Sequence, residues 1–92
     1  MARANLILHL PQHRKTALQV ENDTPEARAA YDSGIGAYVR FLQEQARAAG
    51  FALNTDTRDH PVPFSIDEQD HLAKQDAHAW LQAQPGIWDW IT

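Results

Sequence analysis

The chain has 92 residues, of which 43% are hydrophobic and 22% charged, with no cysteine and a net charge of -4 at pH 7. This length suits one folded domain, which we take as residues 1–92, and the absence of cysteine excludes disulfides and thiol chemistry. The apolar run at residues 6–10 is too short for a membrane span or a signal sequence, so we expect a cytoplasmic protein without a membrane partner.

The charges are unevenly distributed along the chain. Residues 1–20 contain three basic residues and no acidic one, whereas residues 51–92 contain seven acidic and two basic residues. A nucleic-acid-binding surface must neutralise phosphates, so a nucleic-acid partner is not expected for such an acidic C-terminal half.

Two strands are predicted near the N-terminus. Residues 6–10 place three leucines on one face of a strand and Ile7 and His9 on the other, so both faces are expected to be at least partly covered, and Pro11 is expected to end the strand. Residues 16–21 alternate in polarity, with Leu18 and Val20 on one side. The short polar segment between the two runs predicts an antiparallel hairpin.

A long amphipathic helix is predicted at residues 25–49. Thr24 is a suitable N-cap, and Pro25 fits the first helical position, where its missing N–H group is not needed. At the other end, Gly50 can adopt the left-handed conformation that commonly follows a helix. Both ends of this helix are therefore marked locally.

Gly34 and Gly36 interrupt the predicted helix, and each costs about 1 kcal/mol relative to alanine in a helix interior. The chain could instead form a short helix ending near Asp32 and a second one starting near Gly36. We favour one continuous helix, because the apolar positions keep the helical period across the glycines. Gly34, one turn after Ala30, would then provide a flat patch for close approach of another backbone. The glycine spacing does not match a phosphate-binding loop.

A third strand and a second helix are predicted further along the chain. Residues 51–58 alternate as a half-exposed strand, and the prolines within residues 60–63 favour an extended connector. Ser65 and Glu68 have the spacing of a capping box, so a helix is expected to start there and to end before residues 84–86.

The C-terminal residues 87–92 contain two tryptophans, Trp88 and Trp90. We expect so much apolar area at a chain end to be buried away from water. The segment is expected either to dock as a final strand or to contact a partner chain, and we favour docking into the protein's own core.

Together these elements predict an α+β fold, a small two-layer domain with a mainly antiparallel sheet of three to four strands and two helices on one face. The element order is ββαβα plus a short terminal strand.

The five histidines do not form a recognisable metal site, and no cofactor is expected. His71 and His78 are two helical turns apart, about 10 Å, which is too far to ligate one ion directly. His9 interrupts an apolar strand and requires a hydrogen-bond partner if it is buried. His60 precedes a proline in a connector, where functional residues are often found.

The first functional hypothesis is a non-catalytic protein interaction module of the regulator or inhibitor type, which self-associates as a homodimer. It rests on the small size, the absence of a catalytic motif, the acidic second helix and the Trp-rich tail. The residues assigned to binding are Asp67, Glu68, Asp70, Trp88 and Trp90.

The alternative hypothesis is a small-molecule-binding protein or small enzyme with a pocket between sheet and helices. The residues to test for this pocket are His9, Tyr31, Tyr38 and His60. The absence of motifs favours the interaction hypothesis over this one.

Overall fold

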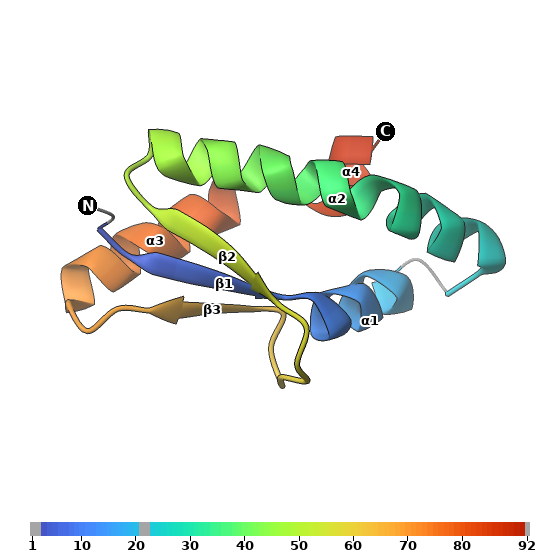
Figure 1. The fold of residues 1–92 in the computed structure, drawn as a ribbon, viewed down its shortest axis with the longest axis horizontal. Coiled ribbons are helices and arrows are strands. Elements are labelled where there is room, and N and C mark those ends of the chain that lie inside the picture. The colour runs from blue at the N-terminus through green and yellow to red at the C-terminus, as the bar shows by residue number, and fades with distance from the viewer. Residues whose placement is uncertain (1–2, 21–22, 92) are drawn as a thin grey trace.

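The computed structural model describes residues 3–20 and 23–91, and this part of the chain forms three strands and four helices (Figure 1). In chain order the elements are β1 (Asn5–His9), α1 (Leu10–Val20), α2 (Pro25–Ala48), β2 (Ala52–Asp56), β3 (Phe64–Asp67), α3 (His71–Ala83) and α4 (Ile87–Ile91). A sheet and a layer of helices make up the domain, in agreement with the expected small α+β class.

The sheet has the strand order β2-β1-β3, so the first strand of the chain is the central one. β1 is parallel to β2, with Leu6 opposite Leu53, and antiparallel to β3, with Leu6 opposite Ile66. The expectation of a mainly antiparallel sheet is therefore wrong, and the sheet is mixed. The parallel pair requires a long crossover, which α1 and α2 provide.

The residues of β1 alternate between a buried face of the sheet and a more exposed one. Leu6 and Leu8 are fully buried in a core that they share with Leu42 of α2 and Ala77 of α3. Asn5, on the opposite face, is exposed. In Figure 1 the strands lie in front of α3, and α2 runs above β2. Among the described residues, the helices thus cover one face of the sheet and leave the other without a helix.

Helix α1 replaces the second strand of the expected hairpin. His13, Ala17 and Leu18 are buried at helical spacing, so residues that alternate over a short run also form one face of a helix. Pro11 lies in the first turn, where its missing N–H is not needed. The proline was correctly expected to end the strand, but it also begins the helix. Residue 21 of the expected strand lies outside the described residues.

Helix α2 runs without interruption through both glycines, as predicted. The Thr24 hydroxyl accepts a hydrogen bond of 3.1 Å from the backbone N–H of Ala27, which caps the N-terminus. Gly50 has a φ of 88°, the left-handed conformation expected after the helix. Local signals at both ends therefore define this element.

The two glycines of α2 have different surroundings. A Cβ atom on Gly34 would lie 2.8 Å from Cδ1 of Ile91, so α4 packs directly against this glycine. The predicted close approach of another backbone at Gly34 is therefore wrong, because the neighbour there is the Ile91 side chain of the same protein. A Cβ atom on Gly36 would meet nothing within 4 Å. Packing within the chain explains Gly34 but not Gly36.

The expected capping box at Ser65 is wrong. Ser65 lies within β3, and α3 begins only after Asp70, whose Oδ1 accepts a hydrogen bond of 3.1 Å from the N–H of Leu72. The strand forms because pairing with β1 places Ile66 opposite Leu6 on the core face. This non-local pairing overrides a local helix-start signal.

The C-terminal segment docks onto the core as the short helix α4, not as a strand. Ile87 is buried, and Nε1 of Trp88 donates a hydrogen bond of 3.1 Å to the carbonyl of Ala17. The ring of Trp90 lies 5.6 Å from that of Tyr38. Both tryptophans therefore contact their own chain, whereas residue 92 lies outside the described part.

Candidate functional site

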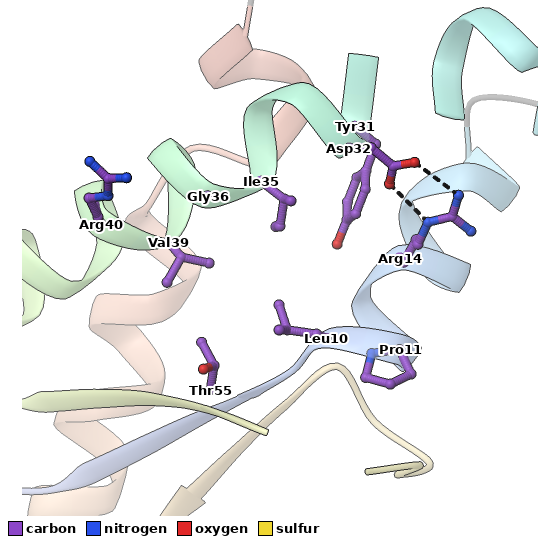
Figure 2. Close-up of a pocket in the computed structure, with 10 residues that line it drawn as sticks. All are labelled: Leu10, Pro11, Arg14, Tyr31, Asp32, Ile35, Gly36, Val39, Arg40 and Thr55. Carbon is purple, nitrogen blue, oxygen red and sulfur yellow. Dashed lines mark hydrogen bonds and ion pairs between the residues drawn. The ribbon is translucent and has the colours of Figure 1, made fainter. Parts of the chain in front are cut away.

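A cleft of about 600 Å³ lies between α1, α2 and the end of β2 (Figure 2). Leu10 projects into it from the start of α1, and Ile35 and Val39 project into it from α2. Thr55 closes the side next to β2. The walls are mostly apolar, so the cleft suits a ligand with apolar surface.

The sheet topology determines where this cleft forms. Because β1 and β2 are parallel, their carboxyl ends meet at the same edge of the sheet, and Leu10 and Thr55 lie at these two ends. In open α/β sheets, the region beyond the carboxyl ends of parallel strands is the common location of ligand sites. Gly36 adds to the opening, because α2 presents no side chain at this position.

Charged side chains occupy the rim of the cleft. Arg14 forms a forked ion pair with Asp32, with Nε to Oδ1 at 3.1 Å and Nη2 to Oδ2 at 3.4 Å. Both side chains are substantially exposed, so solvent screens the pair and it contributes little to stability. Arg40 lies on the same rim, with its guanidinium directed away from the apolar walls in Figure 2. Two cations and one anion give this rim a net positive charge.

A buried histidine, His13, is hydrogen-bonded to Tyr31, which lines the cleft. Nδ1 of His13 and the hydroxyl of Tyr31 form a hydrogen bond of 2.7 Å, and the His13 ring meets the Phe64 ring edge-on at 5.5 Å. Burial lowers the pKa of His13 to about 4 and raises the pKa of Tyr31. At neutral pH the imidazole is therefore uncharged and the phenol keeps its proton. His13 was not predicted as a site residue, because its place between two expected strands indicates a hairpin loop.

A second polar cluster lies on the helix-free face of the sheet, around His9. Its Nε2 is 2.8 Å from the hydroxyl of Ser65, and its Nδ1 is 3.9 Å from Oδ2 of Asp56. The ring stacks on that of His60, with centroids 3.8 Å apart and an interplanar angle of 2°. Nδ1 of His9 is the one buried side-chain nitrogen or oxygen without a hydrogen-bond partner within residues 3–20 and 23–91.

The electrostatics of this cluster favour a neutral imidazole next to a fixed carboxylate. Burial lowers the pKa of His9, and the neighbouring His60 lowers it further. The backbone N–H and the guanidinium of Arg58 hydrogen-bond to Asp56 and hold the pKa of that carboxyl below its usual value. Asp56 therefore stays ionised beside the unpaired nitrogen of His9.

The four residues of the expected pocket fall into two separate groups. His9 and His60 are stacked on the helix-free face of the sheet. Tyr31 lines the cleft on the other face, and Tyr38 lies nearby, with its hydroxyl donating a hydrogen bond of 2.6 Å to the carbonyl of Pro85. Burial raises the pKa of Tyr38 to about 12, so this donor keeps its proton at neutral pH.

The acidic residues assigned to binding have local roles at the start of α3. Asp70 caps the helix, and Oε1 of Glu68 accepts hydrogen bonds from the backbone N–H groups of Gln69 and Asp70 at 2.8 and 2.9 Å. Asp67 is exposed at the end of β3. Asp67 and Asp70 are exposed, whereas Glu68 is half-buried, as are Trp88 and Trp90.

Within the described residues, no three His, Asp or Glu side chains converge closely enough to hold a metal ion. No helix in that part of the chain has both the length and the apolar character needed to cross a membrane. Comparisons of the chain with protein-family models, with curated proteins and with solved structures found no match.

Proposed function

We propose that this protein binds a small molecule with an apolar body and an anionic end in the cleft between α1, α2 and β2. The observation that carries the proposal is Gly36. A glycine inside a helix costs about 1 kcal/mol relative to alanine, and no packing contact within 4 Å requires one at this position. The helix accepts this cost where its backbone borders the cleft, as expected for a surface that a ligand approaches closely.

The size and lining of the cleft support a small ligand. A volume of about 600 Å³ lies within the range of roughly 300 to 1,000 Å³ that is typical of small-molecule sites. Leu10, Ile35 and Val39 would contact the apolar part of the ligand. The positive rim, with Arg14 and Arg40 against Asp32, favours an anionic group at the opening.

The test compares three ligands with the same apolar chain and different ends: octanoate, octanol and octylamine. In NMR titrations we expect octanoate to shift the methyl signals of Leu10, Ile35 and Val39. The dissociation constant of octanol should be about fivefold higher, because one ionic contact at an exposed rim contributes about 1 kcal/mol. Octylamine should bind most weakly, since its cation meets the net positive rim.

The variant that tests the site is Gly36→Leu, whose side chain would occupy open space next to the cleft. This variant should keep the fold, as judged by its amide spectrum, and lose the octanoate-induced shifts. Equal affinity for all three ligands would reject the anionic end. Shifts outside the cleft, or unchanged binding by Gly36→Leu, would contradict the site itself.

The interaction hypothesis stays a prediction, and exposed apolar surface on α3 favours a second copy of this chain as the partner. Leu72 is 70% exposed, and a hollow of about 420 Å³ lined by Ile66, Lys74 and Ala79 lies on the same helix. A projecting leucine and a neighbouring hollow are complementary features that a two-fold axis could bring together. Trp88 and Trp90 pack on their own chain. The contact surface proposed for the dimer is therefore α3 and not the C-terminal tail.

Native mass spectrometry and light scattering test the homodimer. We expect a dimer at protein concentrations of about 100 μM and a monomer for Leu72→Asp, because burying an unpaired carboxylate opposes association. Gln69→Asp adds the same charge at an exposed position close by and should leave the dimer intact. A wild-type protein that is monomeric at this concentration would contradict self-association through α3.

A further inference from the structure

We propose that Ser65 is a nucleophile that accepts the acyl group of small esters, with His9 as its general base and Asp56 as the residue that positions His9. The inference goes beyond ligand binding in the cleft, because the two sites lie on opposite faces of the sheet. It rests on the hydrogen bond between Ser65 and His9, on the Asp56 carboxylate 3.9 Å from the other ring nitrogen, and on the lack of a hydrogen-bond partner for that buried nitrogen.

The strand register places these residues together on rigid elements. His9 and Asp56 are the last residues of β1 and β2 and lie opposite each other in the parallel pair. Ser65 lies opposite Ile7 in the antiparallel pair, on the same face as His9. Each strand of the sheet thus contributes one member, and positions held by three paired strands are fixed more firmly than loop positions.

The contact between Ser65 and His9 has the geometry of a nucleophile and its base. The distance of 2.8 Å from Oγ to Nε2 is within hydrogen-bond range for an O–H donor. Because burial keeps the imidazole neutral, one of its ring nitrogens has a free lone pair at neutral pH. A proton on Nδ1 leaves Nε2 as the acceptor for the serine hydroxyl, and the Asp56 carboxylate on the Nδ1 side favours this tautomer.

Asp56 is placed to orient and stabilise the imidazole during reaction. Its Oδ2 is 3.9 Å from Nδ1, longer than a hydrogen bond, and nothing else in the described chain pairs with that nitrogen. When His9 takes a proton from the serine, the resulting imidazolium attracts the carboxylate and shortens this contact. Contacts between catalytic groups are often loose before substrate binds.

The surroundings indicate which substrates can reach Ser65. His60 covers one face of the His9 ring, which excludes water from the base, while Ser65 itself is half-buried on the helix-free face. Ile7, directly opposite Ser65, is also half-buried and offers a small apolar contact. We expect a short acyl chain with a good leaving group to reach this half-buried serine.

The reaction follows in two balanced steps. The Ser65 oxygen attacks the ester carbonyl carbon while His9 Nε2 takes the hydroxyl proton, and the bond to the leaving alkoxide then breaks as His9 returns this proton to it. The product is an acyl ester on Ser65. A water molecule, deprotonated by His9, then attacks this ester and releases the carboxylic acid, and the proton returns to Ser65.

The experiment uses the full chain and para-nitrophenyl acetate. We expect a burst of para-nitrophenolate, an intact protein heavier by one acetyl group, and a peptide map that places this group on Ser65. Ser65→Ala should lose the burst and the label. Ser33→Ala changes the other serine of the chain, which is exposed on α2, and should react like the wild type.

Two variants distinguish a role in the reaction from a role in folding. Asp56→Asn should slow acylation by about 100-fold, the scale of general-base catalysis, while the circular dichroism spectrum is retained. Ser65→Cys keeps a nucleophile at this position and should still become acetylated. It therefore tests the site even if Ser65→Ala does not fold. An acetyl group on His71, His78 or Lys74 instead of Ser65, or a wild-type burst from Ser65→Ala, would overturn the proposal.

The pH profile gives a readout that a structural role would not change. Acylation should increase as His9 loses its proton, with a midpoint below its ordinary pKa of 6.5, because burial and the positive charges of His60 and Arg58 oppose protonation more than Asp56 favours it. Arg58→Gln should raise this midpoint. A rate that follows only hydroxide concentration would show that His9 is not the base.

Discussion

Between about pH 6.5 and pH 4 we expect the protein to lose about 3 kcal/mol of stability through His13 alone. In the folded state the pKa of His13 is lowered to about 4, against 6.5 in the unfolded chain. Over this interval the unfolded state binds more protons than the folded state, so the stability present above pH 6.5 is lost as the pH falls. The loss is large relative to the 5 to 15 kcal/mol that is typical of whole proteins.

Urea unfolding at several pH values measures this loss, and an NMR titration of the His13 ring gives its midpoint directly. His9 is shifted in the same direction by burial and contributes with the same sign. Asp23 and Asp56 have lowered pKa values, so the stability that they provide above their ordinary pKa of 3.8 is lost mainly below about pH 4, outside the interval in which His13 titrates.

The control for this prediction is His13→Gln, which keeps a polar group opposite the Tyr31 hydroxyl but has no titrating ring. The variant should be less stable than the wild type at neutral pH, because its partner geometry is altered, but its stability should change much less with pH. A wild-type free energy of unfolding that stays constant from about pH 7 to pH 4.5 would contradict the buried neutral imidazole.

The second large effect concerns the two glycines of α2. Gly34→Leu should destabilise the protein by about 1 to 2 kcal/mol, because the leucine must displace the Ile91 side chain, whose Cδ1 would lie 2.8 Å from the new Cβ atom, and this overpacking exceeds the gain in helix propensity. Gly36→Leu should stabilise it by about 0.5 to 1 kcal/mol, because leucine favours the helix and meets no neighbour.

Tryptophan fluorescence distinguishes the two outcomes locally. Trp88 and Trp90 belong to α4 and pack at tilted angles against Tyr31, Tyr38 and Phe41, so Gly34→Leu should shift their emission to longer wavelength. Gly36→Leu should leave the emission unchanged. Equal effects of the two substitutions on stability and fluorescence would mean that α4 does not rest against Gly34.

The elements that could be predicted from sequence are those that local signals define. Helix α2 was predicted nearly to the residue, because Thr24 and Gly50 act within one turn of the chain and the apolar period continues through the glycines. β2 was likewise found from its alternation. The tail was correctly expected to dock, but its form as a helix depends on the surface of α2 that receives it.

The predicted secondary structure was wrong where contacts with residues distant in the sequence determine it. Residues 16–20 fit a strand or a helix equally well over so short a run. His13 and Ala17, which are both buried, are four residues apart, and this spacing is the one that indicates a helix. Ser65 resembled a helix cap, but β1 requires a partner strand, and Ile66 fulfils that role. The pairing of β1 with β2 and β3 could not be derived from local patterns.

The candidate sites were predictable only in part. His9 was noticed because it interrupts an apolar strand, and the expectation that it would find a hydrogen-bond partner is met by Ser65. Asp56 and Ser65 were not connected with it, because only the sheet register brings the three together. The cleft beside Gly36 depends on how α2 crosses the sheet, which no spacing in the sequence specifies.

The central position of β1 also has a consequence for the order of folding. The first strand of the chain has both of its neighbours in residues 52–67, so no part of the sheet can form during synthesis until that region has left the ribosome. Until then Leu6 and Leu8 have no partner strand, whereas α2 can form by local contacts alone. Such long sequence separation between contacts slows folding. We expect a nascent chain with an early helix and a late sheet, and its exposed first strand is the segment most in need of a chaperone.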